Sequence, residues 1–140
     1  MASTLYLKGI QQFGQGNIDW ENDTIKLKYM ATSYTPNPDT ENFLSDVSAS
    51  EASGAPTETL ANAAVNIDTT NDRVEFDADD VTESGITTTT NKFIVYKDTG
   101  VASTSPLIAC IDIAEGTLSP VGGTLAITFN AEGIFSISTT

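Results

Sequence analysis

Histidine is absent from the 140 residues, and cysteine occurs once. Without histidine the chain lacks the usual general base near neutral pH, the commonest zinc ligand and the Ser-His-Asp arrangement of many hydrolases. Cys110 lies in the apolar run LIACIDI, which predicts a buried thiol with no base to activate it. A disulfide within the chain is excluded.

Basic residues and long apolar runs are also scarce. Only 6 Lys and Arg oppose 19 Asp and Glu, for a formal net charge of -13. The basic residues form no stripe that could neutralise phosphates, so we expect no nucleic-acid partner and no anionic membrane partner, whereas a basic protein surface would suit the charge. No run approaches the ~18 apolar residues of a membrane span, and MASTLYLKGIQQFG does not have the pattern of a signal peptide.

Hydrophobic residues make up 39% of the chain and are spread along it, which predicts one globular domain over residues 1–140. Residues 1–16 are interpreted as an N-terminal helix or arm, because Tyr6, Ile10 and Phe13 recur at helical spacing. A strand is the alternative at its start, where Leu5 and Leu7 alternate. Residues 48–64 are small and polar and predict an exposed loop or arm.

Most of the remaining chain alternates with a period of two. The segment TIKLKYMA predicts a half-buried strand, and LANAAVNID with RVEFDA predicts a hairpin in which Val65 and Ile67 face Val74 and Phe76. KFIVYK, LIACIDI, TLAITFN and IFSIST predict further strands. We therefore expect an all-β protein, an antiparallel β-sandwich or barrel of about six to eight strands with a short N-terminal helix.

Before the 48–64 segment, the sequence predicts a single helical turn. The turn would carry Phe43, Leu44 and Val47, and Asp39 or Thr40 would cap it.

The segment VEFDADDVTESG carries four carboxylates, Glu75, Asp77, Asp79 and Asp80, within six positions. An EF-hand loop is excluded because the required oxygen ligands and glycine do not follow Asp77. A weak calcium site at Asp77, Asp79 and Asp80 remains open. Alternation favours a simpler interpretation, in which Val74, Phe76 and Ala78 face inward, the carboxylates face solvent, and Asp80 bonds turn amides.

Two further features are candidate sites. Asp98-Thr99-Gly100 follows an apolar strand, as in aspartic proteases that build one site from two small β subunits, but Lys97 beside Asp98 and the following Val-Ala-Ser depart from that pattern. A turn between strands is the favoured interpretation. Trp20, Tyr34 and Phe43 lie in or beside predicted loops, where they mark a partner-contact surface or cover the ends of the core.

Several phrases in order resemble a family of small bacteriophage and prophage virion structural proteins: GNIDWENDTIKLKYMATSYTPNPDTENFLSDV, DRVEFDADDVT, YKDTGVASTSPLIACIDI and TLAITFNAEGIFSI. The resemblance includes the turn motif made by Lys97, Asp98, Thr99, Gly100, Ser105 and Pro106. Members often have an aromatic residue where this chain has Glu83.

The resemblance implies a virion component without enzymatic activity or cofactor, made in the bacterial cytoplasm. The leading hypothesis is a capsid decoration or cement protein on the outer face of the major capsid protein lattice, as a dimer or trimer. A tail, head-fibre or baseplate component that contacts the host is the alternative, and a dimeric aspartic protease using Asp98 is a distant one.

Overall fold

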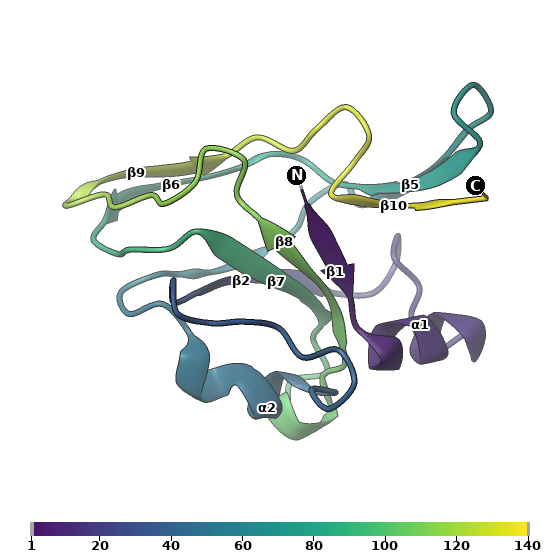
Figure 1. Ribbon diagram of the computed structural model, residues 1–140, viewed down its shortest axis with the longest axis horizontal. Helices are drawn as coiled ribbons and strands as arrows, with labels where there is room; N and C mark the ends of the chain where they lie inside the picture. Colours follow the sequence, from purple (N-terminus) through teal and green to yellow (C-terminus); the bar gives the residue numbers. More distant parts are fainter. Residues whose placement is uncertain (1, 140) are drawn as a thin grey trace.

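The computed structural model describes residues 2–139 and forms two layers of antiparallel strands (Figure 1). The larger sheet has the order β1-β8-β7-β2-β3. Its strands are β1 (Ser3–Leu5), β8 (Leu107–Asp112), β7 (Lys92–Lys97), β2 (Ile25–Met30) and β3 (Thr57–Thr59). The predicted all-β class with a short N-terminal helix is confirmed, although the described chain has ten strands rather than six to eight.

The second layer consists of two smaller sheets placed end to end. One has the order β10-β5-β4 and the other pairs β6 with β9. Their strands are β10 (Phe135–Ser138), β5 (Arg73–Asp77), β4 (Ala64–Asp68), β6 (Val81–Ile86) and β9 (Gly123–Ile127). Figure 1 shows β5 continuing into β6, and β9 leading through a loop into β10 in the same direction, so that the two small sheets form one long cover over the larger sheet.

Alternation along the strands fills the space between the layers. Ile25, Leu27 and Tyr29 of β2 belong to the main core, while Lys26 and Lys28 lie on the opposite face. The predicted hairpin register is confirmed, since Val65 pairs with Phe76 and Ile67 with Val74. The core is extensive for a chain of this size, so the fold needs neither metal nor disulfide.

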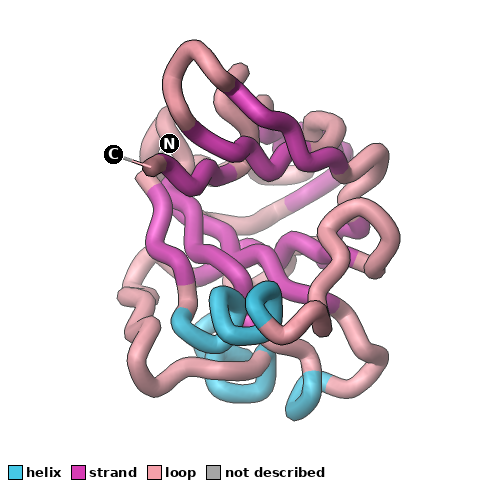
Figure 2. Tube along the Cα trace, turned by 90° about the vertical axis from the view of Figure 1, so that its right-hand side faces the viewer, coloured by secondary structure: helices cyan, strands magenta, loops and turns pink. Residues whose placement is uncertain are grey.

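The outer face of the larger sheet is also apolar and has its own cover. Met30, Ile94, Tyr96, Leu107 and Cys110 form a second buried cluster there. The helices α2 (Leu44–Val47) and η1 (Ser48–Ser50) lie on this side, and Figure 2 shows the helical segments gathered below the strands. Burial raises the pKa of the Cys110 thiol to about 12, which agrees with the predicted inert thiol.

Both interpretations of the N-terminal segment hold in part. Ser3–Leu5 forms β1 on β8, and Leu7–Gly14 forms helix α1, which packs against β8. The chain changes from strand to helix at Tyr6, whose side chain is completely buried. Within the described chain, residues 2–16 are therefore part of the folded body and not a free arm.

The prediction of an exposed loop or arm at 48–64 is wrong in its central part. Thr57–Thr59 pairs with β2 as β3, and Glu51 bridges to Met30. Lys28 fixes the segment through its ion pair with Glu51 (3.0 Å). Small polar residues carry no apolar pattern, but their backbone groups complete a sheet edge as well as any others.

The helical turn at Phe43, Leu44 and Val47 forms as predicted, but its cap is a different residue. Asp46 accepts hydrogen bonds from the backbone amides of Asn42 (2.8 Å) and Phe43 (2.9 Å). These bonds hold the pKa of Asp46 below its usual range. Neither Asp39 nor Thr40 has this position, because the helix begins later than the sequence pattern suggests.

Gly9 determines how closely α1 approaches β8. A methyl group added there would lie 2.6 Å from the carbonyl oxygen of Leu107 and 2.8 Å from Cα of Ile108. Gly14, at the end of the same helix, has open space around it.

We predict that Gly9→Ala lowers the free energy of unfolding by about 1–3 kcal/mol through overpacking, although alanine favours helix. The matched control Gly14→Ala should leave stability unchanged or raise it by up to about 1 kcal/mol. Urea unfolding followed by far-UV circular dichroism measures both. Equal effects of the two substitutions would contradict the close packing of α1 on β8.

Candidate functional site

The four carboxylates of the acidic segment do not converge on one site, and each has different surroundings. Glu75 binds Arg73 (2.9 Å), and Asp79 accepts a hydrogen bond from Asn62 Nδ2 (2.6 Å). Asp80 Oδ1 accepts one from the backbone amide of Phe129 (2.8 Å), which lies across the β6–β9 pair. The expected bond to amides of its own turn is therefore replaced by a long-range bond that fixes where β9 ends.

The inward side of this segment is as predicted. Phe76 is buried in the main core, and Val74 and Ala78 pack against it. The Asp77 carbonyl accepts a hydrogen bond from Trp20 Nε1 (2.9 Å), while its buried Oδ1 has no hydrogen-bond partner. Within residues 2–139, no three or more histidine, cysteine, aspartate or glutamate side chains are placed to hold a metal ion.

The turn motif closes into a hydrogen-bonded loop at one end of the larger sheet. Thr99 N–H donates to Ser105 Oγ (3.1 Å), and Ser105 Oγ donates to the Val101 carbonyl (2.9 Å). Ser105 is completely buried. Pro106 bridges to Phe43, and the amide of Leu44 donates to the Ser105 carbonyl (2.9 Å). The motif thus anchors α2.

Asp98 is held in its ionised form. Its Oδ2 contacts Lys26 Nζ at 2.6 Å, and its Oδ1 accepts the Gly100 amide at 2.9 Å. These contacts keep the pKa of Asp98 below its usual range, Lys26 being the larger cause. An aspartic protease dyad must share one proton between two carboxyls, and this arrangement opposes protonation. The neighbouring Lys97 turns away to Asp23 (2.9 Å) and the Asn17 carbonyl (2.6 Å).

Two of the three candidate contact aromatics are interior residues. Trp20 is only 2% exposed and packs edge-on against Phe76 and Phe135. Tyr34 is 6% exposed, and its hydroxyl bonds Tyr6 (2.6 Å) and Glu41 (2.7 Å). They cover the core, which was the alternative interpretation, and they do not form a contact surface.

Phe43 differs from the other two because it is half-buried. Lys8 lies over its ring at 5.2 Å, and Phe43 forms the bridge to Pro106. Part of the ring is therefore accessible beside the turn motif, and it alone of the three aromatics keeps an exposed face.

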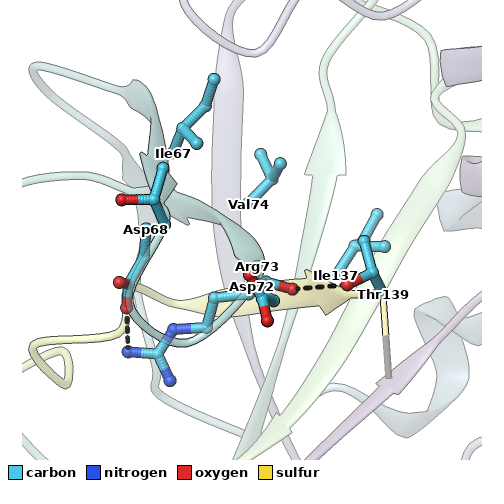
Figure 3. Close-up of a pocket in the computed structure, with 8 residues that line it drawn as sticks. Ile67, Asp68, Asp72, Arg73, Val74, Ile137 and Thr139 are labelled. Atoms are coloured by element: carbon cyan, nitrogen blue, oxygen red, sulfur yellow. Dashed lines mark hydrogen bonds and ion pairs between the residues drawn. The ribbon is translucent and has the colours of Figure 1, made fainter.

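An exposed apolar surface lies at the end of the second layer that is formed by β4, β5 and β10. Ile67, Val74 and Ile137 form one cross-strand row on β4, β5 and β10. Ile67 is 77% exposed and Ile137 is 47% exposed. The row lines an open depression of about 220 Å³, and Figure 3 shows the three side chains with their polar neighbours.

This row has the same orientation as core residues. Phe76 and Phe135 occupy the next row along the same face and are buried. The sheet extends beyond the layer beneath it by one row, so Ile67 and Ile137 stay exposed while Val74 packs partly against the core. A second small cavity, of about 50 Å³, connects Ile137 to Ile10 on α1, which is 48% exposed. We call Ile10, Ile67, Val74 and Ile137 the end surface.

The border of the end surface is acidic. Arg73 contacts Asp68 (3.1 Å), Glu75 (2.9 Å) and Glu132 (2.8 Å), and Asp72 also lines the depression. One guanidinium thus stands among four carboxylates. The negative charge left over would attract cationic side chains and would repel a second copy of the same surface.

Sequence reasoning missed the end surface although it placed the residues correctly. Alternation assigned Ile67 and Val74 to the inner face of the hairpin, and they do lie there. Alternation along a strand does not reveal how far the opposite layer extends, and that extent decides whether an inner face is covered. The neighbouring Asp68 and Asp72 were the available signal, since charge beside an apolar row is unusual in a closed core.

Comparison with known proteins returned no match: no family model matches the sequence, and no significant match occurs among curated proteins or solved structures. Among residues 2–139, neither α1 nor any other helix has the length and hydropathy needed to cross a membrane.

We predict that Asp98→Asn changes the acid limb of the stability curve. Because the folded-state pKa of Asp98 lies below its ordinary value of 3.8, its ion pair stabilises the protein above that value and is lost as the pH falls through the folded pKa. The variant should lose less than about 1 kcal/mol at pH 7 and should show a shallower decline below pH 3.8.

Chemical unfolding at pH 7 and at successively lower pH measures this difference. Asp39→Asn is the control, since Asp39 is exposed and forms no ion pair with a described residue. An acid limb identical to that of the unchanged protein would show that Lys26 does not stabilise the carboxylate.

Proposed function

We propose that this protein is a non-enzymatic bacteriophage virion protein that decorates the capsid and docks through the end surface onto the outer face of the major capsid protein lattice. The observation that supports docking is the exposed cross-strand row of Ile67, Val74 and Ile137 with its acidic border. The resemblance of the sequence phrases to phage virion proteins supports a place in the virion.

The chemistry of the end surface defines the partner. An apolar centre with a charged border is the usual anatomy of a specific protein contact. The excess of carboxylates around Arg73 requires lysine or arginine around the partner's apolar patch. Contact between two copies through this surface is disfavoured, because each carries the same sign of border charge and a net charge of -13. Any dimer or trimer on the lattice would use another face.

Attachment in many copies fits this surface. A single contact of this size is modest, but repeated attachment across a lattice gives a durable layer. The body of the protein suits that role, because α1, the turn motif and residues 48–64 are all packed onto the sheets. A rigid domain loses little conformational freedom on docking.

A tail, head-fibre or baseplate location is the alternative placement for the same surface. Quantitative mass spectrometry of purified particles distinguishes the two. Copy numbers that match the capsid lattice support decoration, and a few copies per particle support the tail. Asp98→Asn tests the distant alternative of a dimeric aspartic protease, since unchanged processing of virion proteins would remove it.

We predict that Ile67→Ser weakens binding to capsids that lack the protein by roughly tenfold or more, because it removes one apolar side chain from the centre of the contact. Purified protein is added to such particles, and the bound fraction is measured by sedimentation. Val121→Ser is the matched control, because Val121 is 85% exposed and lies outside the end surface.

Equal binding by Ile67→Ser and the unchanged protein would exclude the end surface as the docking site. No binding by any variant to the particles, despite lattice-matched copy number in complete virions, would indicate incorporation during assembly. Particles without the protein that survive heat and osmotic shock as well as complete ones would show that reinforcement is not its role.

A further inference from the structure

Two glutamates from opposite layers meet inside the sandwich. Glu58 of β3 pairs with Leu27, and Glu83 of β6 pairs with Leu125. Directly paired residues point to the same face of a sheet, and both leucines lie in the main core at 1% exposure or less. The two carboxyl groups therefore point into the space between the layers. Burial raises the pKa of Glu58, and the charge of Glu83 raises it further.

A buried phenol is the third member of this cluster. Tyr29 lies on the same face of β2 as Leu27 and is completely buried. Its hydroxyl has no hydrogen-bond partner among the described residues. Leu27 is the strand partner of Glu58, and Tyr29 follows it by two residues on the same face, so the phenol ring neighbours Glu58 diagonally across the strand pair.

The cluster has unmet bonding capacity. The buried Oε1 of Glu58 has no hydrogen-bond partner among the described residues. Leaving such buried oxygens unpaired is unfavourable, because each has lost its hydrogen bonds to water. Two adjacent carboxylates also repel unless a positive charge or a proton lies between them.

No basic side chain supplies that charge. All 6 lysines and arginines have partners elsewhere in the described chain. Lys28 is nearest along the strand, but it points to the opposite face and binds Glu51 and Thr57. The positive charge must come from outside the chain.

We propose that Glu58, Glu83 and Tyr29 bind a calcium ion between the two layers. Hard oxygen ligands carrying two negative charges suit Ca²⁺, whose irregular coordination tolerates few protein ligands completed by water. β3 is the outer strand of the larger sheet and Glu58 is half-buried, so water and ions reach the cluster from that edge. The ion would join β3 of the larger sheet to β6 of the second layer. This site does not depend on the proposed function.

The test uses the full chain, freed of divalent ions with a chelator. At pH 7.5, thermal unfolding is followed during titration with CaCl₂ and, separately, with MgCl₂ at matched ionic strength. We expect a saturable rise in Tm of several degrees with Ca²⁺ at concentrations on the order of 10⁻⁴ to 10⁻³ M, and a smaller rise with Mg²⁺, which demands stricter geometry.

Variants locate the ion. Glu83→Gln should abolish most of the Ca²⁺-induced rise, and Tyr29→Phe should reduce it. The measured quantity is the rise and not the starting Tm, because removing one of two repelling carboxylates can itself stabilise the protein. Asp79→Asn, in the acidic segment, is the control for binding elsewhere and should keep the full response.

Terbium luminescence gives a second measurement, since Tb³⁺ replaces Ca²⁺ and accepts energy from an adjacent tyrosine. The signal should fall on addition of Ca²⁺ and should be lost in Tyr29→Phe. The proposal is overturned if Ca²⁺ and Mg²⁺ act equally, or if Glu83→Gln keeps the full response. A rise in Tm on lowering the pH to 5 with no Ca²⁺ response would show that the pair holds only a proton.

Discussion

The structure depends on one constraint, which is that the larger sheet is apolar on both faces. Its central strands, β7 and β8, bury side chains on each side, so the sheet needs two covers. The small sheets form one cover, and residues 31–50 with α2 form the other. The turn motif and the buried Tyr34 are explained by this requirement, because both hold the second cover in place.

Positive charge is scarce, and the fold uses it locally. Lys26, Lys28 and Lys97 each attach a loop or edge segment to the larger sheet through one carboxylate. Arg73 gathers three carboxylates at the far end of the second layer. Since no basic residue remains for the other acidic groups, the surface is strongly anionic, and the carboxyls of Glu58 and Glu83 face each other without a protein counter-charge. The same shortage thus produces the acidic border of the end surface and the proposed ion site.

One proposed site lies at the end of the second layer and the other lies between the two layers, and both follow from how the layers meet. At the β4–β5 end the sheet extends past its cover and exposes an apolar row. Where β3 and β6 meet at the sheet edge, two acidic side chains point into the space between the layers. The end surface lacks a covering layer and therefore suits a protein partner. The pair of Glu58 and Glu83 lacks a positive charge and therefore suits a cation.

The sequence by itself determined most of the strands, helix α1 and the pairing of the β4–β5 hairpin. A period of two marked the strands, helical spacing at Ile10 and Phe13 marked α1, and the register of Val65 and Ile67 against β5 followed from the turn between them. These features depend on neighbours close along the chain, so local pattern contains them. Only the tertiary structure decided which inner faces were covered and that Glu58 and Glu83 point into the same space. Each of those outcomes depends on where one layer ends against another, and contacts between residues far apart in sequence leave no periodic trace in either segment alone.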